Sequence, residues 1–119
     1  MYSHVCLTDA REYAFVAGQV AVDKEGSVVG KNDFDTQIRQ VFANLEQAVL
    51  AAGAGMENIC KMTTYLVHSQ DIENFYRVRA DIFREYFPSG EYPPNTLLII
   101  DRLVREEFLI EVEAIDAVG

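Results

Sequence analysis

The sequence predicts a single α+β domain over residues 1–119, in which a mixed β-sheet carries two helices on one face. Two stretches have apolar residues at helical spacing, whereas others are rich in β-branched and aromatic residues or alternate in polarity. Each predicted helix has one apolar face, so both helices are expected to cover the same side of the sheet. Half of the 119 residues are hydrophobic, which is enough for one core without disulfides.

The first third of the chain is predicted to be β-structure. Residues 13–22 are rich in β-branched and aromatic side chains and are interrupted by Gly18. A glycine inside a strand often marks a bulge or a close approach of the backbone to another group. Residues 23–27 have the composition of a turn, and Val28 and Val29 predict a short returning strand.

The first helix is predicted over residues 35–52. Asp33 or Asp35 can cap its start, and Gly53 can end it. Its apolar residues follow the i, i+3, i+4, i+7 pattern of one buried face: Ile38, Val41, Phe42, Leu45 and Val49.

A strand is predicted over residues 61–67, and a second amphipathic helix runs from about residue 71 to residue 87, where Pro88 stops it. Two further strands finish the chain, joined by a polar loop over residues 102–107. Residues 95–100 are apolar at both strand parities, which predicts burial on both faces. Two helices on one side cannot provide this, so we expect the sheets of different subunits to pack together.

Composition and charge argue against several classes of partner. The net charge is −9, and the ten basic residues form no cluster, so nucleic acid is not an expected partner. No segment approaches the ~20 apolar residues of a membrane span. The N-terminus lacks the features of a signal peptide, so a cytoplasmic location is expected. Cys6 and Cys60 form no disulfide framework or zinc motif, and no metal or cofactor is expected.

The last strand sets two carboxylates in a mostly apolar segment. By parity, Glu111 and Glu113 share one face, and Ile110 and Val112 lie on the other. The Glu face is either simply solvated, or one glutamate lies at a subunit seam and orients water or acts as a general base. Asn95 and Thr96 directly follow two prolines. This rigid entry is either an ordinary strand start or a means of holding an amide and a hydroxyl in a cleft.

Several segments in order resemble the Rid family of reactive intermediate deaminases, also called YjgF-like proteins. Residues 15–20 (FVAGQV) look like the Ser-Gly-Gln strand of the family, and residues 61–66 (KMTTYL) look like its Lys-Thr-Thr strand. Residues 110–115 (IEVEAI) are similar to its Val-Glu-Ile-Glu-Ala-Ile ending. The N-terminal Tyr2-Ser3-His4 and the helix end near residues 51–54 also fit, so the resemblance covers nearly the whole chain.

The resemblance implies a chorismate-mutase-like subunit (β-β-β-α-β-α-β-β) that forms a homotrimer with ligand clefts between subunits. Active members of the family hydrolyse imines derived from enamines, without a cofactor. The matching glutamate, Glu111, would help hold the attacking water. Tyr2, Gly18 and Leu97 match residues that line the cleft.

The chain departs from the family pattern at two cleft positions. The family's substrate-gripping arginine is replaced by Asn95, followed by Thr96. An amide cannot replace a bidentate, permanently charged guanidinium, so efficient deamination of small imino acids is in doubt. Arg79, on the second helix, stands where active members tend to have a cleft-lining asparagine. Arg79 either supplies the missing charge from the opposite wall or is an exposed arginine paired with a nearby acid.

Three functions therefore compete. The first is a hydrolase of C=N or related bonds that acts on a small carbonyl- or imine-containing metabolite. The second is a non-catalytic, small-metabolite-binding or regulatory trimer, in which Asn95 and Thr96 are hydrogen-bonding ligands. The third is a scaffold. Retention of Tyr2, Gly18 and Glu111 favours a working cleft.

Overall fold

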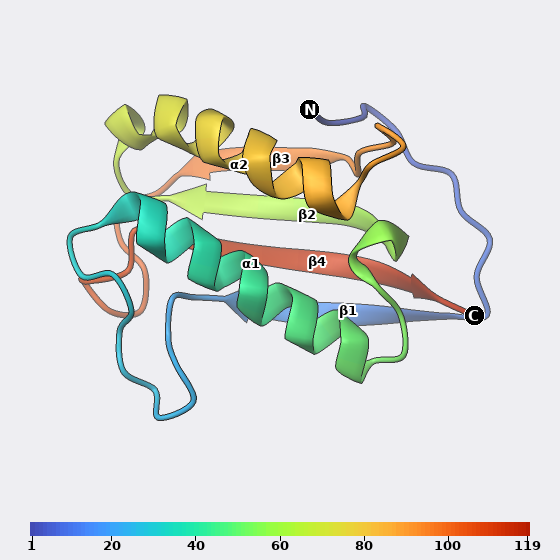
Figure 1. The fold of residues 1–119 in the computed structure, drawn as a ribbon, viewed down its shortest axis with the longest axis horizontal. Helices are drawn as coiled ribbons and strands as arrows, with labels where there is room; N and C mark the ends of the chain where they lie inside the picture. The colour runs from blue at the N-terminus through green and yellow to red at the C-terminus, as the bar shows by residue number, and fades with distance from the viewer.

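A computed structural model describes all residues of the chain, 1–119, as one α+β subunit (Figure 1). Its elements, in chain order, are β1 (Glu12–Gln19), α1 (Phe34–Ala51), β2 (Ile59–Leu66), α2 (Ile72–Tyr86), β3 (Asn95–Ile99) and β4 (Ile110–Val118). Both predicted helices are present, and their bounds differ from the expected ones by a single residue at each end.

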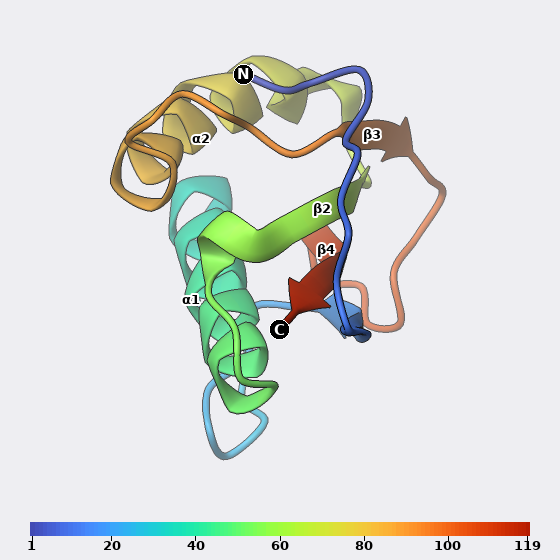
Figure 2. The same ribbon diagram turned by 90° about the vertical axis from the view of Figure 1, so that its right-hand side faces the viewer.

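The four strands form one mixed sheet in the order β1-β4-β2-β3. Strand β4 is antiparallel to both β1 and β2, whereas β3 is parallel to β2 and forms an edge. Helices α1 and α2 lie on the same face of this sheet, and the other face carries no helix (Figures 1 and 2). The predicted layer arrangement is therefore confirmed.

Local signals set the helix ends. The Asp33 carboxylate accepts hydrogen bonds from the Thr36 backbone N–H (3.2 Å) and hydroxyl (2.7 Å), which caps α1 as expected. Gly53 adopts φ +93 just after the last turn, a conformation that favours glycine. Helix α2 ends two residues before Pro88.

The core lies between the helices and the covered face of the sheet. Alternate residues of β4 point into it, and Phe42 of α1 meets Phe83 of α2 edge-on with ring centroids 5.8 Å apart. The largest fully buried apolar side chains are Phe42, Phe75, Phe83, Phe108, Ile38, Leu45, Met62, Leu66 and Ile110. The apolar faces predicted for both helices supply most of this core.

The N-terminal β-region is simpler than expected. Only β1 joins the sheet, and the predicted returning strand is reduced to an isolated bridge between Val22 and Val28. Because only Val28 and Val29 separate the turn from Gly30, the segment is too short for a ladder. The pairing of β1 with β4 shifts register between Val16 and Gln19, so the bulge expected at Gly18 is present.

The helix-free face of the sheet exposes large apolar side chains. On this face, Phe15 of β1 is 77% exposed and Leu98 of β3 is 43% exposed, whereas Ile99, which is 45% exposed, is in register with the buried Leu66 and lies on the other face of the edge strand. The two-sided burial predicted for β3 is therefore absent from the isolated chain, because nothing within one copy covers this edge and face. Neither helix combines the length and the apolarity that crossing a bilayer would need.

Candidate functional site

The carboxylates of β4 lie on the helix-free face, as their parity predicted. Glu111 pairs with Tyr65 of β2 in the strand register, and the Tyr65 hydroxyl donates a 2.5 Å hydrogen bond to Glu113. Glu111 is half-buried, and this burial, helped by the negative charge of Glu113, raises the pKa of its carboxyl. Glu111 is therefore a better proton acceptor than an ordinary surface glutamate.

Gly18 is the backbone position against which the Glu111 side chain rests. A Cβ built on Gly18 would overlap the Glu111 carboxylate and would lie only 2.8 Å from its Cγ. Gly18 does not have a positive φ, so the glycine is required here by space rather than by backbone conformation. The bulge in β1 and the absence of a side chain together make room for the carboxylate.

Tyr2, Asn95 and Thr96 come together at a second place, around the start of β3. They line a cavity of about 420 Å³ with the rest of the N-terminal segment. Ser3 forms a parallel bridge with Pro94, and its hydroxyl donates to the Tyr92 carbonyl (2.5 Å). These contacts hold the N-terminal segment beside the double proline (Figure 2).

Asn95 and Thr96 point to opposite faces of β3. The Thr64 hydroxyl donates to Asn95 Oδ1 (2.8 Å) on the helix side, which leaves the amide Nδ2 as a free donor. On the open side, Lys61 Nζ donates to the Thr96 hydroxyl (2.9 Å). Leu97 follows on the helix side, partly buried against the core. Lys61 was not among the predicted site residues, because its proximity to Thr96 depends on the pairing of β2 with β3.

Arg79 lies on the buried face of α2. Arg79 is only 3% exposed. Its guanidinium carbon lies 4.9 Å from the ring centroids of Phe75 and Tyr76 and 5.4 Å from the ring centroid of Phe83. Burial lowers the pKa of the guanidinium, and the phenol of Tyr2 is close enough to oppose that shift. Of the two alternatives for Arg79, an exposed arginine paired with an acid is wrong.

These residues form two separate groups within one copy of the chain. Strand β2 separates Glu111 of β4 from Asn95 of β3, so their strands are about 10 Å apart. The two residues are also offset along the strands, because Glu111 pairs with Tyr65 whereas Asn95 pairs with Met62. They also point to opposite faces, since Glu111 is in register with Tyr65 and Asn95 with Met62. A small molecule bound to one group cannot touch the other in the same subunit.

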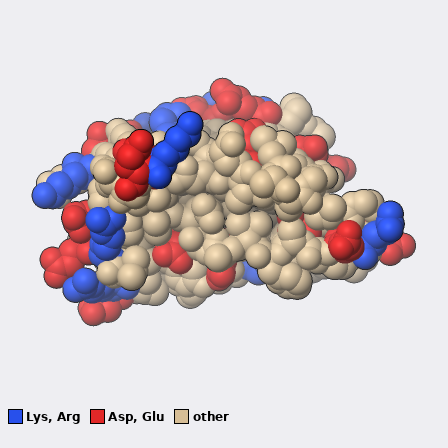
Figure 3. Space-filling model, turned by 90° about the horizontal axis from the view of Figure 1, so that it is seen from below, with Lys and Arg blue, Asp and Glu red and all other residues tan.

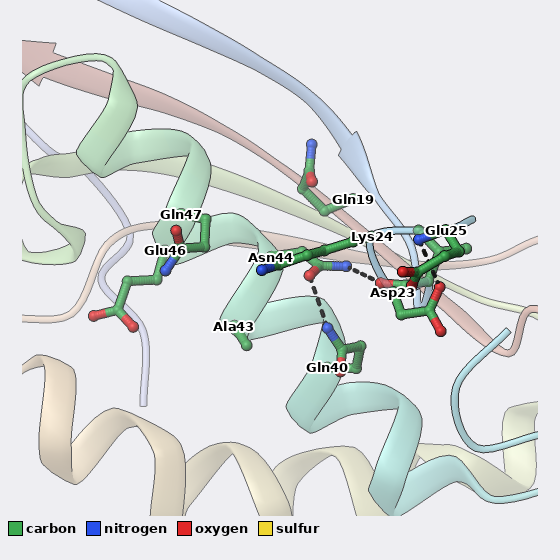
Figure 4. Close-up of a pocket in the computed structure, with 10 residues that line it drawn as sticks. Gln19, Asp23, Lys24, Glu25, Gln40, Ala43, Asn44, Glu46 and Gln47 are labelled. Atoms are coloured by element: carbon green, nitrogen blue, oxygen red, sulfur yellow. Dashed lines mark hydrogen bonds between the residues drawn. The ribbon is translucent and has the colours of Figure 1, made fainter. Parts of the chain in front are cut away.

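A hollow of about 910 Å³ between α1 and the loop after β1 contains none of the predicted site residues (Figure 4). Asn44 of α1 lies in it and donates to the carbonyls of Val20 (2.8 Å) and Val22 (3.0 Å). Gln40 donates to Asn44 in turn (2.8 Å), so this network ties α1 to the chain after β1. The amide groups of Asn44 and Gln40 are therefore engaged in structural hydrogen bonds.

The surface charge shows no basic groove on the face drawn in Figure 3, where acidic and basic side chains are intermingled at both ends. No group of three or more His, Cys, Asp and Glu side chains is placed to hold a metal ion.

The sequence analysis also missed Asp116. This residue is fully buried, and neither carboxylate oxygen has a hydrogen-bond partner. Burial raises the pKa of its carboxyl to about 6. The parity that placed Ile110 and Val112 on the core face also reaches Asp116, so the signal was present in the sequence.

Comparisons with known proteins agree on one family. The family model described as "Endoribonuclease L-PSP" matches residues 1–118. A RutC family protein of Pyrococcus horikoshii is 32% identical over 106 residues, which covers 89% of this chain and 79% of that protein.

Solved structures are similar over the same length. The Rid family protein YyfB of Yersinia pestis, of unknown function, matches with a TM-score of 0.86 at 33% sequence identity. The match covers 98% of this chain and 86% of the YyfB chain. The YjgF gene product of E. coli matches with a TM-score of 0.80 at 27% sequence identity, over 92% of this chain and 84% of the YjgF chain.

Proposed function

Because the chain belongs to the endoribonuclease L-PSP family of Rid/YjgF-like proteins, we propose that it is a hydrolase of C=N bonds in a small metabolite. We place the reaction in a cleft between subunits of a homotrimer. The observation that carries the proposal is the half-buried Glu111 carboxylate, whose pKa is raised and which rests on the Gly18 backbone.

The division of the candidate residues supports a site shared between copies. Glu111 and Gly18 form one group, and Tyr2, Asn95 and Thr96 form the other, on the far side of β2. A neighbouring copy would bring the second group against the first. The exposed apolar side chains of the open face, such as Phe15 and Leu98, are the surface that such an assembly would bury.

The chemistry follows from the raised pKa of Glu111. Its carboxylate accepts a proton from a water molecule, and the water oxygen attacks the carbon of the protonated imine. Glu111 returns this proton to the nitrogen of the resulting carbinolamine, and ammonia leaves as the carbon–oxygen double bond forms and the hydroxyl proton passes to the ammonia. For each protonated imine, one water is consumed and one carbonyl compound and one ammonium ion are released, so the reaction requires no cofactor.

The ribonuclease activity in the family's description receives no support from this chain. Phosphate binding depends on clustered lysine and arginine, and this chain has a net charge of −9. The carboxylates of Glu111 and Glu113 on the open face of β4 would repel a phosphate backbone further.

A second candidate function is a non-catalytic trimer that binds a small metabolite. Asn95 favours it, because an amide stands where active relatives are expected to carry the substrate-gripping arginine. The loss of one charge-assisted contact is worth roughly 1.5–3 kcal/mol, which is enough to weaken turnover of small imino acids severely.

One assay separates the two candidates. We would generate 2-iminobutanoate in situ and measure ammonia release by the wild type, Glu111→Ala and Asn95→Arg. Wild-type activity that disappears in Glu111→Ala supports the hydrolase. Activity found only in Asn95→Arg supports a cleft that has changed to binding, and equal activity in wild type and Glu111→Ala contradicts the role of Glu111.

A further inference from the structure

The two cysteines of the chain lie beside the same cavity, although they are far apart in the sequence. Cys6 of the N-terminal segment and Cys60 of β2 both line the cavity of about 420 Å³ at the start of β3, and both are free thiols. Burial raises the pKa of the Cys60 thiol, and Cys6 lies near enough to raise it further. The fold therefore brings together two thiols that the proposed hydrolysis does not use.

A bulge in β2 turns the Cys60 side chain out of the core. The pairing of β2 with β4 shifts register between Ile59 and Lys61, so Cys60 is the extra residue. Ile59 and Met62 are both buried, whereas the two residues between them are only partly buried, which breaks the alternation of the strand. The Cys60 thiol donates a single weak hydrogen bond, to the Ile115 carbonyl (3.3 Å). The bulge thus presents a lightly bonded thiol to the cavity.

The segment that carries Cys6 is held at few points. None of the 63 backbone–backbone hydrogen bonds uses residues 4–11, and within this stretch only the Thr8 carbonyl accepts a side-chain hydrogen bond, at 3.3 Å. Ser3, which bridges to the residue before β3, anchors its start. The segment passes the end of the sheet at which β2 begins (Figures 1 and 2). Cys6 can therefore adopt the separation of about 4.4–6.8 Å between Cα atoms that a disulfide to Cys60 needs.

We propose that Cys6 and Cys60 are a redox pair, which a hydroperoxide converts to a disulfide that fastens the N-terminal segment across the start of β2. The segment also carries Tyr2, so the bond fixes one wall of the cavity at the start of β3, and reduction releases it. This inference does not depend on the hydrolase proposal, because the cysteines take no part in that reaction.

The exposures of the two thiols set the order of the chemistry. The exposed Cys6, as its thiolate, attacks one oxygen of hydrogen peroxide; the O–O bond breaks, and the hydroxide that leaves takes up a proton to become water. The half-buried Cys60 thiol then attacks the sulfur of the Cys6 sulfenic acid. The S–O bond breaks, and the hydroxyl leaves as water with the Cys60 proton. Two thiols are oxidised to one disulfide, and one peroxide is reduced to two waters.

A trapping experiment tests the pairing directly. We would treat the full-length wild type, Cys6→Ser and Cys60→Ser with hydrogen peroxide and dimedone, which captures sulfenic acids, and map the products by mass spectrometry. The wild type should lose two hydrogen atoms and yield one Cys6–Cys60 crosslink within a single chain, whereas Cys60→Ser should yield the dimedone adduct of Cys6. In Cys6→Ser, Cys60 should remain a thiol at least about tenfold longer, because it is less exposed and less ionised. In concentrated urea, the ratio of crosslink to adduct in the wild type should fall at least about tenfold, because the fold no longer holds the thiols together.

Thermal unfolding gives a second readout that does not rely on trapping. Closing the long loop between Cys6 and Cys60 should raise the melting temperature of the oxidised wild type by about 5–15 °C, and dithiothreitol should reverse the rise. Neither serine variant should respond to peroxide in this way. Four results would overturn the inference: a crosslink between chains instead of within one, a dimedone adduct in place of the disulfide in the folded wild type, an equal crosslink yield in urea, or an unchanged melting temperature after oxidation.

Discussion

The close contact between Gly18 and Glu111 provides the sharpest prediction. In Gly18→Ala, the new Cβ would lie 2.8 Å from Glu111 Cγ and would overlap the carboxylate itself. Ordinary contact for a Cβ begins at about 3.4 Å, so the carboxylate must move by an ångström or more. A displacement of about 1 Å in a catalytic group can cost about a hundredfold in rate. We therefore expect a fall of that order in kcat for ammonia release from 2-iminobutanoate.

The same substitution should leave the fold almost unchanged. Gly18 has no positive φ, and the group that must yield is the end of a flexible side chain rather than backbone. The free energy of unfolding in urea should change by less than about 1 kcal/mol. A double-mutant cycle on kcat with Glu111→Gln supplies the control. Once the carboxylate is gone, Gly18→Ala should lower kcat no further. Full activity in Gly18→Ala would refute the role assigned to this contact.

Three further predictions concern buried charge and the open face. Asp116→Asn should stabilise the protein at neutral pH, because the folded pKa of about 6 lies above the ordinary 3.8. The free-energy penalty for ionising Asp116 is absent below about pH 4 and complete above about pH 6. In urea unfolding at pH 7.5, the free energy of unfolding of Asp116→Asn should therefore exceed that of the wild type by up to roughly 3 kcal/mol, and this difference should disappear at pH 4. The negative charge of Glu113 helps to raise the pKa of Glu111, so Glu113→Gln should move the acid limb of the pH profile of kcat/KM to lower pH. An acid limb at the same pH in both proteins would contradict this coupling. Phe15→Asp, at a side chain that is 77% exposed in one copy, should shift the particle mass in analytical ultracentrifugation toward the monomer, whereas an unchanged mass would remove Phe15 from the interface.

Local patterns in the sequence predicted most of the fold. The helical spacing of apolar residues gave both helices, and Asp33 and Gly53 marked the ends of α1. Strand parity placed Glu111 on the open face, and Gly18 indicated a close backbone approach. These features depend on residues near one another in the chain, so short-range chemistry is sufficient to predict them.

Features that depend on the order of the strands were beyond the reach of such patterns. That Gly18 approaches Glu111 in particular follows from the pairing of β1 with β4. The bond from Lys61 to Thr96 likewise requires β2 to lie beside β3, and no local signal places these strands together. The burial of Arg79 depends on three rings and on how α2 packs, so the sequence alone left two alternatives open.

A mixed-oligomer experiment tests the central proposal most directly. Glu111→Gln removes one group of the site, and a variant carrying Asn95→Ala and Thr96→Ala removes the other. If each site draws these groups from two neighbouring copies, co-expression of the two inactive chains in equal amounts should restore about one quarter of the wild-type ammonia release. No recovery in verified mixed oligomers would contradict a site shared between subunits.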